Sequence, residues 1–415
     1  MSAEETLRAL SAQEAPHFAW ASSPRVRRVV AALEAARPAS ARFVGGCVRD
    51  SIMGLAPKDV DVATTLKPDE VIAALESARL RYAPTGLAHG TVTAICERKP
   101  VEITTLRADV TTDGRRATVA FTDDWDVDAR RRDFRLNAIY LTTDGRLYDP
   151  VGGVADAKTG RVRFIGDPHA RIREDYLRIL RFFRFTARFA ETFDAQGLAA
   201  CAAERAGLAI LSRERVGDEM SKILALPRAA FAIEAMAKTG VLAAVWPAPA
   251  DLDALAALKR LAPDAPAPLA LAALWGEGGE GIDAALRLSN ADARRRKTAL
   301  AAARAVSLDM RERDARACLH RFGEAAFRAG ALLAAARAGG GKEPSARLDA
   351  LLAVAPPPPF PFTGKDVVRR GVAPGPDVAK VLRQTEEAWI AEDFPPRERL
   401  ERILADKAAQ ARSDE

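Results

Sequence analysis

The hydrophobic pattern of the chain changes character along its length. Up to about residue 150, short β-branched runs alternate with helical stretches such as PDEVIAALESAR (68–79). After about residue 170, Ala/Leu/Arg segments with helical spacing take over. We therefore expect an α+β protein, with an N-terminal α/β head followed by helices. The predicted strands are RFVGG (42–46), DVDVAT (59–64), TVTAIC (91–96) and VEITTL (101–106).

Proline-rich breaks divide the helical part of the chain. The run APPPPFPF (355–362) contains too much proline for a helix or a central strand, so it predicts a linker before a last helical segment at 378–394. Together with the change of pattern near residue 150, these breaks predict an α/β head, a mostly helical remainder and a short helical module after the linker.

Two acids lie two residues apart in the second predicted strand. Strand alternation places Asp59 and Asp61 on one face, where neighbouring carboxylates repel each other unless a cation lies between them. Hard oxygen ligands of this kind suit Mg²⁺. Glu102, on another predicted strand, is a candidate third carboxylate. The alternative for all three is an ordinary solvent-facing acid on a strand.

A glycine pair precedes these acids, in the segment GGCVRD (45–50). Gly45 and Gly46 allow backbone N–H groups to approach an anion at the start of a helix that carries Arg49. A glycine pair alone predicts only a turn. Combined with the two acids, it predicts a pocket for a triphosphate and a metal ion.

Arginines gather in two further segments. In DARRRDFRLNAIYL (128–141), the run 130–132 leads directly into an apolar pattern, which indicates that packed structure holds its basic end and aims it inward. In ARIREDYLRILRFFRFTARF (170–189), helical spacing places Asp175, Arg178 and Arg181 near one face. This polar stripe is either an intrahelical ion pair or a reader of the Watson–Crick edge of a base.

Composition narrows the class of protein. The 415 residues are 48% hydrophobic and 28% charged, which excludes wholesale disorder, and the net charge of +6 favours polyanionic partners. Four scattered cysteines contain no CxxC pair, so a structural zinc site is not expected. The acidic N-terminal segment and the lack of a long apolar run predict a cytoplasmic protein without membrane contact, and no obligate protein partner is evident.

The motifs GGCVRD, PKDVDVAT, RRDFRLNA and REDYLRILRFFRF occur in the order and spacing of the class II branch of the nucleotidyltransferase superfamily, which the chain resembles over about residues 40–190. Its C-terminal FTGKDVVRRGVAPGPDVAKVL also resembles the tail of the CCA-adding enzymes in that family. The resemblance implies template-independent addition of CCA to the 3′ end of tRNA from CTP and ATP, with release of pyrophosphate. It also implies four parts: a catalytic head at 26–150, a helical neck at 151–235 that carries the base-reading helix, a helical body at 236–355 and a helical tail at 356–415 that contacts the tRNA.

The resemblance also implies a role for each matching residue. Asp59 and Asp61 match the metal-binding carboxylates, and Glu102 the third catalytic acid. Asp175 and Arg178 match the pair that reads the incoming base, and the helix after them carries Arg181 and Arg184. The other nucleotide-binding positions are Gly45, Gly46 and Arg49 at the triphosphate, and Arg131, Asp133 and Asn137 at the nucleotide and ribose.

Three other functions stay open at this point. A poly(A) polymerase would use the same chemistry with ATP alone, and a CC-adding enzyme would stop before the final A. An RNA-binding protein with an inactive head is disfavoured by the intact pair of Asp59 and Asp61. The segment 108–126 is long and polar with a basic centre, and we predict that it is a mobile element needed for adding A.

Overall fold

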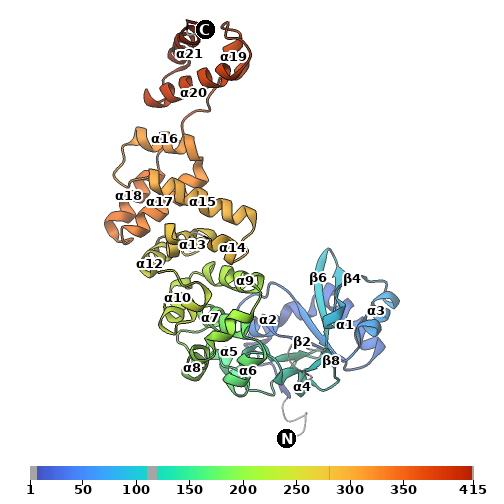
Figure 1. Cartoon of the computed structure of the whole chain (residues 1–415). Helices are drawn as coiled ribbons and strands as arrows, with labels where there is room; N and C mark the ends of the chain where they lie inside the picture. The colour runs from blue at the N-terminus through green and yellow to red at the C-terminus, as the bar shows by residue number, and fades with distance from the viewer. Residues whose placement is uncertain (1–6, 110–118, 280, 414–415) are drawn as a thin grey trace. The chain divides into compact units, whose positions relative to one another are not determined.

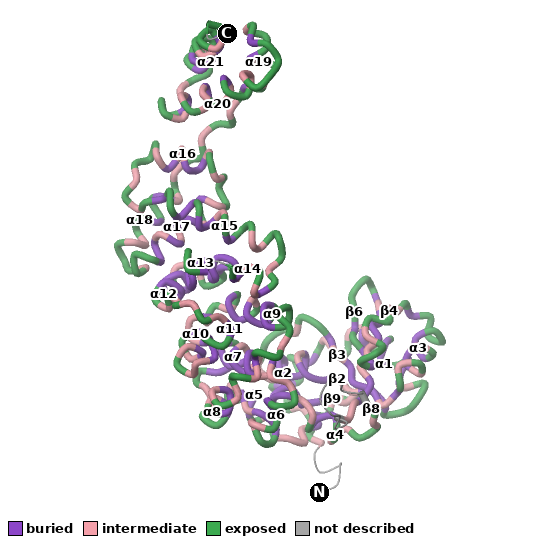
Figure 2. Tube along the Cα trace, viewed as in Figure 1, coloured by how far each residue is buried: buried purple, intermediate pink, exposed green. Residues whose placement is uncertain are grey.

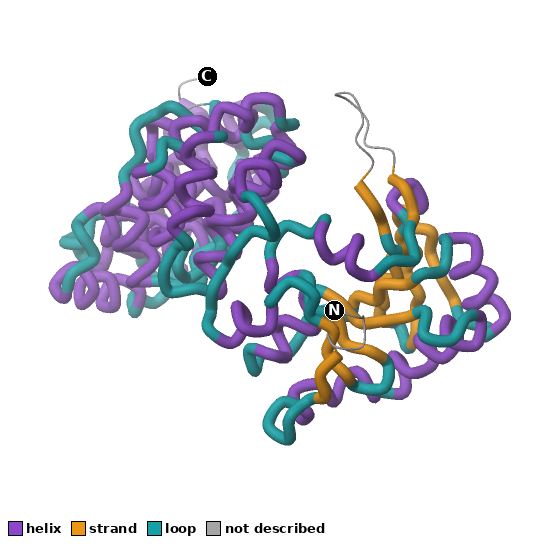
Figure 3. The backbone as a smooth tube through the Cα atoms, turned by 90° about the horizontal axis from the view of Figure 1, so that it is seen from below, coloured by secondary structure: helices purple, strands orange, loops and turns teal. Residues whose placement is uncertain are grey.

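The structure is a computed structural model that describes residues 7–109, 119–279 and 281–413 (Figure 1). The chain separates into two compact units, one made of Met1–Ser212 with Ala235–Val245 and the other of Arg213–Glu234 with Trp246–Glu415. Within the described residues, all strands belong to the first unit, drawn in orange in Figure 3. The α+β class predicted from the hydrophobic pattern is thus confirmed.

An eight-stranded sheet forms the centre of the first unit. Its pairs are antiparallel except for β3 and β6, which run parallel. A separate two-stranded ribbon consists of β7 (Arg107–Asp109) and β8 (Val119–Phe121). The strand order across the main sheet is β1 (Leu7–Ala9), β10 (Arg146–Tyr148), β9 (Tyr140–Thr142), β2 (Ala41–Val44), β3 (Asp61–Thr64), β6 (Lys99–Thr105), β5 (Thr91–Cys96) and β4 (Arg81–Gly86).

The four strands predicted from sequence all form, but the strand predicted over 59–64 begins only at Asp61. Asp59 lies in the bend after Pro57, outside the strand, because the first ladder contact is the Glu102 N–H donating to the Val60 carbonyl at 3.2 Å. Asp59 is exposed and Asp61 half-buried. The prediction that strand alternation places both acids on one face is therefore wrong for Asp59.

Two helices pack together against the sheet. Apolar residues of α1 (Pro24–Ala36) recur at helical spacing and are buried, namely Val26, Val29, Val30 and Leu33. Its partner α3 (Pro68–Ser77) confirms the helix predicted at 68–79, with proline at its first position and acids in its first turn. The short helices and turns nearby are η2 (Ala15–Ser22), α2 (Gly46–Ile52), η3 (Leu87–His89), α4 (Trp125–Arg130), η4 (Arg135–Asn137) and α5 (Gly153–Lys158).

The single helix predicted over 170–189 is in fact two helices, α6 (Pro168–Glu174) and α7 (Leu177–Phe189). Asp175 has extended backbone angles of φ −156° and ψ 104°, and its Oδ1 accepts a hydrogen bond from the Leu177 N–H at 3.1 Å. A short acidic side chain that bonds to the backbone two residues later competes with helix continuation. Asp175 therefore ends α6, and its carboxylate accepts from the first N–H of α7, so Asp175 does not share a helical stripe with Arg178.

An aromatic cluster fixes α7 against the arginine-rich segment. The Phe134 ring lies 5.0 Å from Phe164 and 5.3 Å from Phe185, and Phe164 stacks on Phe182 at 5.3 Å. Phe134 and Phe182 are fully buried. Because Phe134 directly follows Asp133, this core holds the polar end of the segment beside the polar face of α7.

Helices complete both units. The first unit also contains α8 (Ala195–Ala203), η5 (Arg205–Ile210) and α11 (Val241–Val245), while α10 (Ala229–Lys238) spans the division. In the second unit α13 is apolar on all sides and is buried over Pro268–Trp275, as Figure 2 shows in purple. The helices of that unit are α9 (Arg213–Leu224), α12 (Leu252–Leu261), α13 (Ala267–Trp275), η6 (Gly276–Gly279), α14 (Ile282–Ala285), α15 (Asn290–Ala305), α16 (Glu312–Phe322), α17 (Glu324–Arg337), α18 (Lys342–Leu352), α19 (Gly364–Val368), α20 (Pro376–Ala391) and α21 (Arg397–Ser413).

The second unit contains two distinct apolar clusters near its end. One, the body cluster, is built on Phe327, Leu348 and Leu351, and the other, the tail cluster, on Trp389, Leu400 and Leu404. Residues 355–363, between them, adopt neither helix nor strand, as their proline content predicts. The predicted last helix at 378–394 forms as α20, which ends at Ala391. The four-part division itself stays a prediction.

Candidate functional site

A cavity of about 590 Å³ opens in the first unit. The glycine turn, β3, the arginine-rich segment and α7 all contribute to its wall. Eight arginines and three aspartates give this lining an excess of positive charge, which favours a polyanionic ligand. The lining residues are Gly45, Gly46, Arg49, Asp61, Arg107, Arg131, Arg132, Asp133, Asn137, Asp175, Arg178, Arg181, Arg184, Phe185 and Arg188.

Two larger cavities have fewer charged residues in their linings. One of about 750 Å³ lies between α19 and the start of α20, beside Lys365 and Arg369, and one of about 700 Å³ lies between α1 and α3 with a lining made mostly of alanine. Size alone would favour these two. The density of charged groups singles out the arginine-lined cavity instead.

Most of the residues expected from sequence to form a site meet at this cavity. Eleven of the thirteen candidates line it, although they come from segments far apart in the chain. The two exceptions are Asp59 and Glu102, which are exposed and do not contribute to the lining. The structure thus brings the expected nucleotide-binding residues and Asp61 together at one cavity. Asp59 and Glu102 lie outside its lining.

The glycine turn meets the cavity at a point of tight backbone geometry. Gly45 has φ +70° and ψ −123°, a conformation that L-residues with a side chain rarely adopt. A β-carbon at Gly45 would lie 3.8 Å from Nη1 of Arg132 and 3.9 Å from the carbonyl oxygen of Asn137. Glycine at this position therefore allows the turn to form and leaves room for the backbone to approach a ligand.

A chain of hydrogen bonds connects the glycine helix to α7. Arg49 donates from Nη1 to Oδ1 of Asn137 at 2.6 Å, and Nδ2 of Asn137 donates to Oδ1 of Asp133 at 3.0 Å. Nε of Arg181 donates to Oδ2 of the same carboxylate at 2.7 Å. Burial would raise the pKa of Asp133, but the charge of Arg181 and these hydrogen bonds lower it. The four side chains therefore act as one ordered polar network across three elements.

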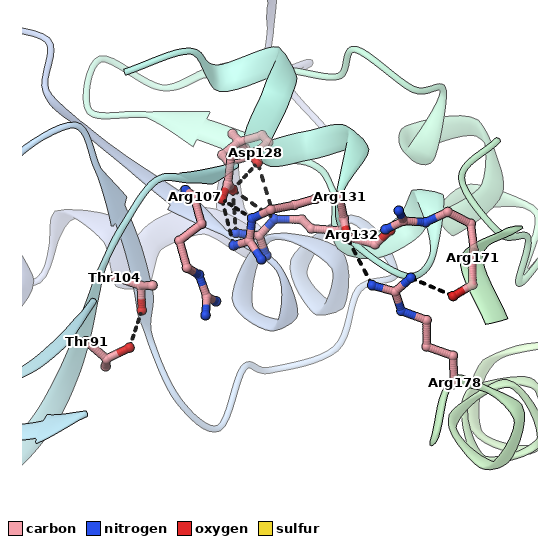
Figure 4. A network of polar contacts seen from close by, with 9 residues as sticks. Thr91, Thr104, Arg107, Asp128, Arg131, Arg132, Arg171 and Arg178 are labelled. Carbon is pink, nitrogen blue, oxygen red and sulfur yellow. Dashed lines mark hydrogen bonds and ion pairs between the residues drawn. The ribbon is translucent and has the colours of Figure 1, made fainter. Parts of the chain in front are cut away.

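Asp128 organises the arginine run, as the dashed lines of Figure 4 show. Its buried carboxylate accepts hydrogen bonds from Arg131 Nε at 2.9 Å, Arg132 Nη2 at 3.0 Å, Tyr140 OH at 2.7 Å and the Arg107 backbone N–H at 3.1 Å. Burial opposes ionisation, yet the charges of Arg132 and Arg131 hold the pKa of Asp128 well below its usual range. Asp128 thus fixes the two guanidinium groups that line the cavity.

Backbone carbonyls and one acid hold Arg178 (Figure 4). Nη1 donates to the Arg171 carbonyl at 2.7 Å, and Nη2 donates to the Arg131 carbonyl at 3.2 Å. Glu174, one turn earlier along the chain, forms an ion pair with Arg178 and a second ion pair with Arg171. An intrahelical pair of Asp175 with Arg178 is excluded as the explanation of their spacing, since Asp175 lies between the two helices.

Carboxylates crowd at the end of β3. Asp61 is paired in register with Glu102 on the neighbouring parallel strand β6. Burial, followed by the charges of Glu102 and Asp59, raises the pKa of Asp61 to about 6, although Arg132 and Arg49 act in the opposite direction. A cation near Asp61 and Asp59 would relieve this repulsion, so these residues fit a divalent metal ion. Across the described part of the chain, no group of three or more His, Cys, Asp or Glu residues is arranged to hold a metal.

Sequence reasoning missed several residues at this site. Arg188 follows Arg181 and Arg184 at helical spacing on α7, so periodicity could have found it. Asp128 lies three and four residues before Arg131 and Arg132, a spacing that signals ion pairs on a helix. Arg107 has no such signal, because only the turn of the chain after β6 brings it to the cavity.

The segment expected to be needed for adding A is only partly described. Of residues 108–126, positions 110–118 lie outside the described residues. The flanking parts form the β7–β8 ribbon, in which Arg107 pairs with Phe121. The role predicted for this segment stays a prediction.

The sheet, the glycine turn, the acid pair and the arginine-lined cavity define a nucleotidyltransferase with a head of the poly(A) polymerase type. Residues 41–163 match the family described as the poly A polymerase head domain, and residues 192–252 match a probable RNA and SrmB-binding site of polymerase A. The mitochondrial CCA tRNA nucleotidyltransferase 1 of Mus musculus is 35% identical over 373 residues, which cover 84% of this chain and 82% of that protein. The chain belongs to the CCA tRNA nucleotidyltransferase family.

Bacterial relatives agree with this assignment. The CCA-adding enzyme of Geobacillus thermodenitrificans is 38% identical over 203 residues, which cover 48% of this chain and 49% of that protein. The crystal structure of the Bacillus stearothermophilus CCA-adding enzyme in complex with CTP superposes with a TM-score of 0.74 at 27% identity, covering 94% of this chain and 100% of the other. The Thermotoga maritima CCA-adding enzyme complexed with tRNA has a TM-score of 0.69 at 18% identity, covering 98% and 99%, which supports the fold alone.

Proposed function

We propose that the protein adds C, C and A in turn to the 3′ end of tRNA, using CTP and ATP and releasing pyrophosphate. The observation that carries this proposal is the meeting of the glycine turn, the half-buried Asp61 and eight arginines at one cavity, in a chain of this family. Nucleotidyl transfer needs such an arrangement, since it depends on positioning and charge stabilisation more than on proton-transferring side chains.

The arginines would bind the triphosphate. Arg49 and Arg132 lie beside the glycine turn, where a guanidinium group can pair with phosphate oxygens in two parallel hydrogen bonds. Their other contacts, to Asn137 and Asp128 respectively, hold these side chains before a ligand arrives. A site organised in advance loses less entropy on binding and stabilises the charge that develops on the leaving pyrophosphate.

Asp59 and Asp61 would hold Mg²⁺, with Glu102 beside them. Bound there, Mg²⁺ would lower the pKa of the tRNA 3′-hydroxyl and neutralise charge on the phosphates. The chain itself contributes the crowded carboxylates, whose mutual repulsion favours a cation, and Arg132, which lowers the pKa of Asp61. Asp59 reaches this position from a bend, so the pair combines one strand residue with one loop residue.

Asp175 and Arg178 would select the base. Cytosine and adenine each present a ring nitrogen that accepts and an amino group that donates, which one guanidinium and one carboxylate complement. Uracil and guanine present the opposite pattern. Both side chains line the cavity, and the break between α6 and α7 lets Asp175 approach it at an angle that a continuous helix would not allow.

Base selection can be tested through four nucleotides. In Asp175→Ala and Arg178→Ala proteins, we expect kcat/KM for CTP and ATP to fall relative to UTP and GTP, with a loss of discrimination of about 1–3 kcal/mol per group. Arg173→Ala is a matched control on α6, because Arg173 is exposed and pairs with Glu204. Unchanged nucleotide preference in both variants would contradict the assignment.

One assay tests the function as a whole. A tRNA transcript that lacks its 3′ CCA is incubated with labelled CTP and ATP, separately and together, in the presence of Mg²⁺. We expect addition of two C residues with CTP alone and completion of CCA with both nucleotides, and no addition by the Asp61→Ala protein. Extension by ATP alone would indicate a poly(A) polymerase, and a product ending in CC with both nucleotides would indicate a CC-adding enzyme.

The cytoplasm is the compartment that we propose. All four cysteines, Cys47, Cys96, Cys201 and Cys318, are buried free thiols, a state typical of proteins in a reducing environment. The described helices include none whose length and hydropathy would suit a membrane crossing. Fractionation of cells that produce the tagged protein would test the location.

A further inference from the structure

A patch of threonine hydroxyls lies on the sheet next to the crowded acids. On β6, Thr104 follows Glu102 by two residues, so both side chains project from the same face, and both are accessible while Ile103 between them is buried. On β5, Thr93 lies opposite Glu102 and Thr91 lies opposite Thr104. The threonines therefore continue the row of groups that begins with the acids, on the side away from β2.

The threonines are hydrogen-bonded in pairs. Oγ1 of Thr91 lies 3.1 Å from Oγ1 of Thr104, a contact drawn in Figure 4, and Oγ1 of Thr85 lies 2.7 Å from Oγ1 of Thr93. An irregularity in the β4–β5 register between Ala83 and Gly86 accompanies the second contact. A hydroxyl has one donor and two acceptor positions, so each pair keeps one donor and several acceptors for another molecule.

We infer that the pair of Thr91 and Thr104 binds the 2′-hydroxyl of the nucleotide at the 3′ end of the acceptor RNA. This inference rests on the proposed function, which places the acids beside the reacting 3′-hydroxyl. In a ribose the 2′- and 3′-hydroxyls are on adjacent carbons, so a group that bonds to the 2′-hydroxyl must lie next to the site of the 3′-hydroxyl. Thr104 meets this condition, since it is two residues from Glu102 on the same strand face.

The chemistry of the patch favours a hydroxyl group over a phosphate. Thr91 and Thr104 carry no charge, whereas the arginine-lined cavity supplies the positive charge that phosphates need. A hydroxyl that both donates and accepts matches a 2′-hydroxyl that does the same, and this group distinguishes RNA from DNA. The arginine-lined cavity would thus bind the nucleotide, and the threonine patch would select RNA over DNA as the acceptor.

The test is a comparison of two acceptors and two proteins. The acceptors are tRNA minihelices that lack CCA and end in either a ribonucleotide or a 2′-deoxynucleotide, both with a free 3′-hydroxyl. The proteins are wild type and Thr91→Val/Thr104→Val, which preserves branching at the β-carbon and strand propensity. Incorporation of the first C is measured as kcat/KM for each acceptor.

We expect wild type to lose on the order of tenfold in kcat/KM on the deoxy acceptor, the loss typical of one or two missing hydrogen bonds. The valine double variant should show a similar loss on the ribo acceptor and little further loss on the deoxy acceptor. Thr91→Ser/Thr104→Ser, which keeps the hydroxyls, should restore the preference for the ribo acceptor. Thr142→Val on β9 is a matched control, because that threonine lies in the same sheet beyond β2 and should leave the preference unchanged.

The outcomes separate the two claims. If wild type extends the ribo acceptor but the valine variant retains the wild-type ratio between acceptors, the threonine assignment is wrong and the proposed function stands. The same conclusion follows if the serine variant behaves like the valine variant, since the effect then does not depend on the hydroxyls. If wild type extends neither acceptor, both claims fail.

Discussion

At the scale of single residues, the environment of Asp61 disfavours the ionised form of its carboxyl group. Its pKa is raised to about 6 from an ordinary value near 3.8, first by burial and then by the charges of Glu102 and Asp59. In the folded protein without metal, ionised Asp61 is therefore destabilised above pH 6. Below pH 3.8 Asp61 is protonated in both states, and it does not lower the free energy of unfolding. Between pH 3.8 and pH 6 the free energy of unfolding falls as the pH rises, because the unfolded state releases the Asp61 proton more readily than the folded state.

The substitution Asp61→Asn should make the metal-free protein more stable at pH 7.5, by on the order of 2 kcal/mol. This gain should shrink at pH 5, where wild-type Asp61 is largely protonated in the folded state. Urea unfolding in EDTA at both pH values measures the difference. Added Mg²⁺ should raise the Tm of wild type more than that of the Asn variant.

Asp69→Asn is a suitable control, because Asp69 lies in the first turn of α3, away from the acids. An equal response of the two variants to pH, or an equal shift of Tm with Mg²⁺ in wild type and Asp61→Asn, would contradict this account of Asp61.

At the scale of elements, α4 is short but positions much of the cavity wall. Asp124 caps its N-terminus through hydrogen bonds to the N–H groups of Asp126 and Val127, and Asp128 then meets two arginines just beyond its C-terminus. The Arg107 N–H bonds to the same carboxylate, so one buried side chain connects α4 to β7. Removing its charge would leave two partly buried guanidinium groups without their main partner.

The substitution Asp128→Asn should therefore destabilise the protein by about 2–4 kcal/mol and raise the KM for CTP. Asp126→Asn on the same helix is the matched control. Asp126 is half-buried, its ion pair with Arg130 spans 3.7 Å, and an asparagine oxygen can still accept the 2.8 Å hydrogen bond from the Tyr148 hydroxyl, so the substitution should cost less than about 1 kcal/mol. Chemical unfolding and steady-state kinetics measure both effects. Equal costs for the two substitutions would show that Asp128 has no special organising role.

At the scale of the whole molecule, a small polar contact connects the body and tail clusters of the second unit. His320 on α16 lies 2.8 Å from Glu386 on α20, and its ring packs edge-on against Trp389 and Phe394. Arg316 pairs with Asp393 at 3.0 Å. The chain between the clusters, residues 355–363, has no regular structure, and these side chains bridge the two clusters directly.

The double substitution His320→Ala/Arg316→Ala should loosen the tail from the body without unfolding either cluster. We expect faster proteolytic cleavage near residues 355–363 and a separate, earlier melting step in calorimetry. Arg347→Ala is the control, because Arg347 pairs with Asp309 and Glu343 within the body. A double variant that keeps the wild-type cleavage rate and a single melting step would show that these contacts do not connect the clusters.

The sequence by itself determined the fold class and most of the candidate site. The local pattern was sufficient for α3, which buries one face at helical spacing, and for β2 and β5, which are short β-branched or apolar runs buried on both faces. The motifs were sufficient for eleven cavity residues, since the glycine turn and the arginine-rich segments carry residue types that serve phosphate binding. Such local patterns can be read without knowledge of the fold.

Only the tertiary structure decided the placement of individual side chains. The break at Asp175 depends on one side-chain hydrogen bond that competes with helix continuation, and the start of β3 depends on its parallel partner β6. Arg107 reaches the cavity because the chain turns after β6, and the threonine pair of β5 and β6 forms through their register. These features arise from contacts between residues distant in sequence, whose energies a local pattern does not contain.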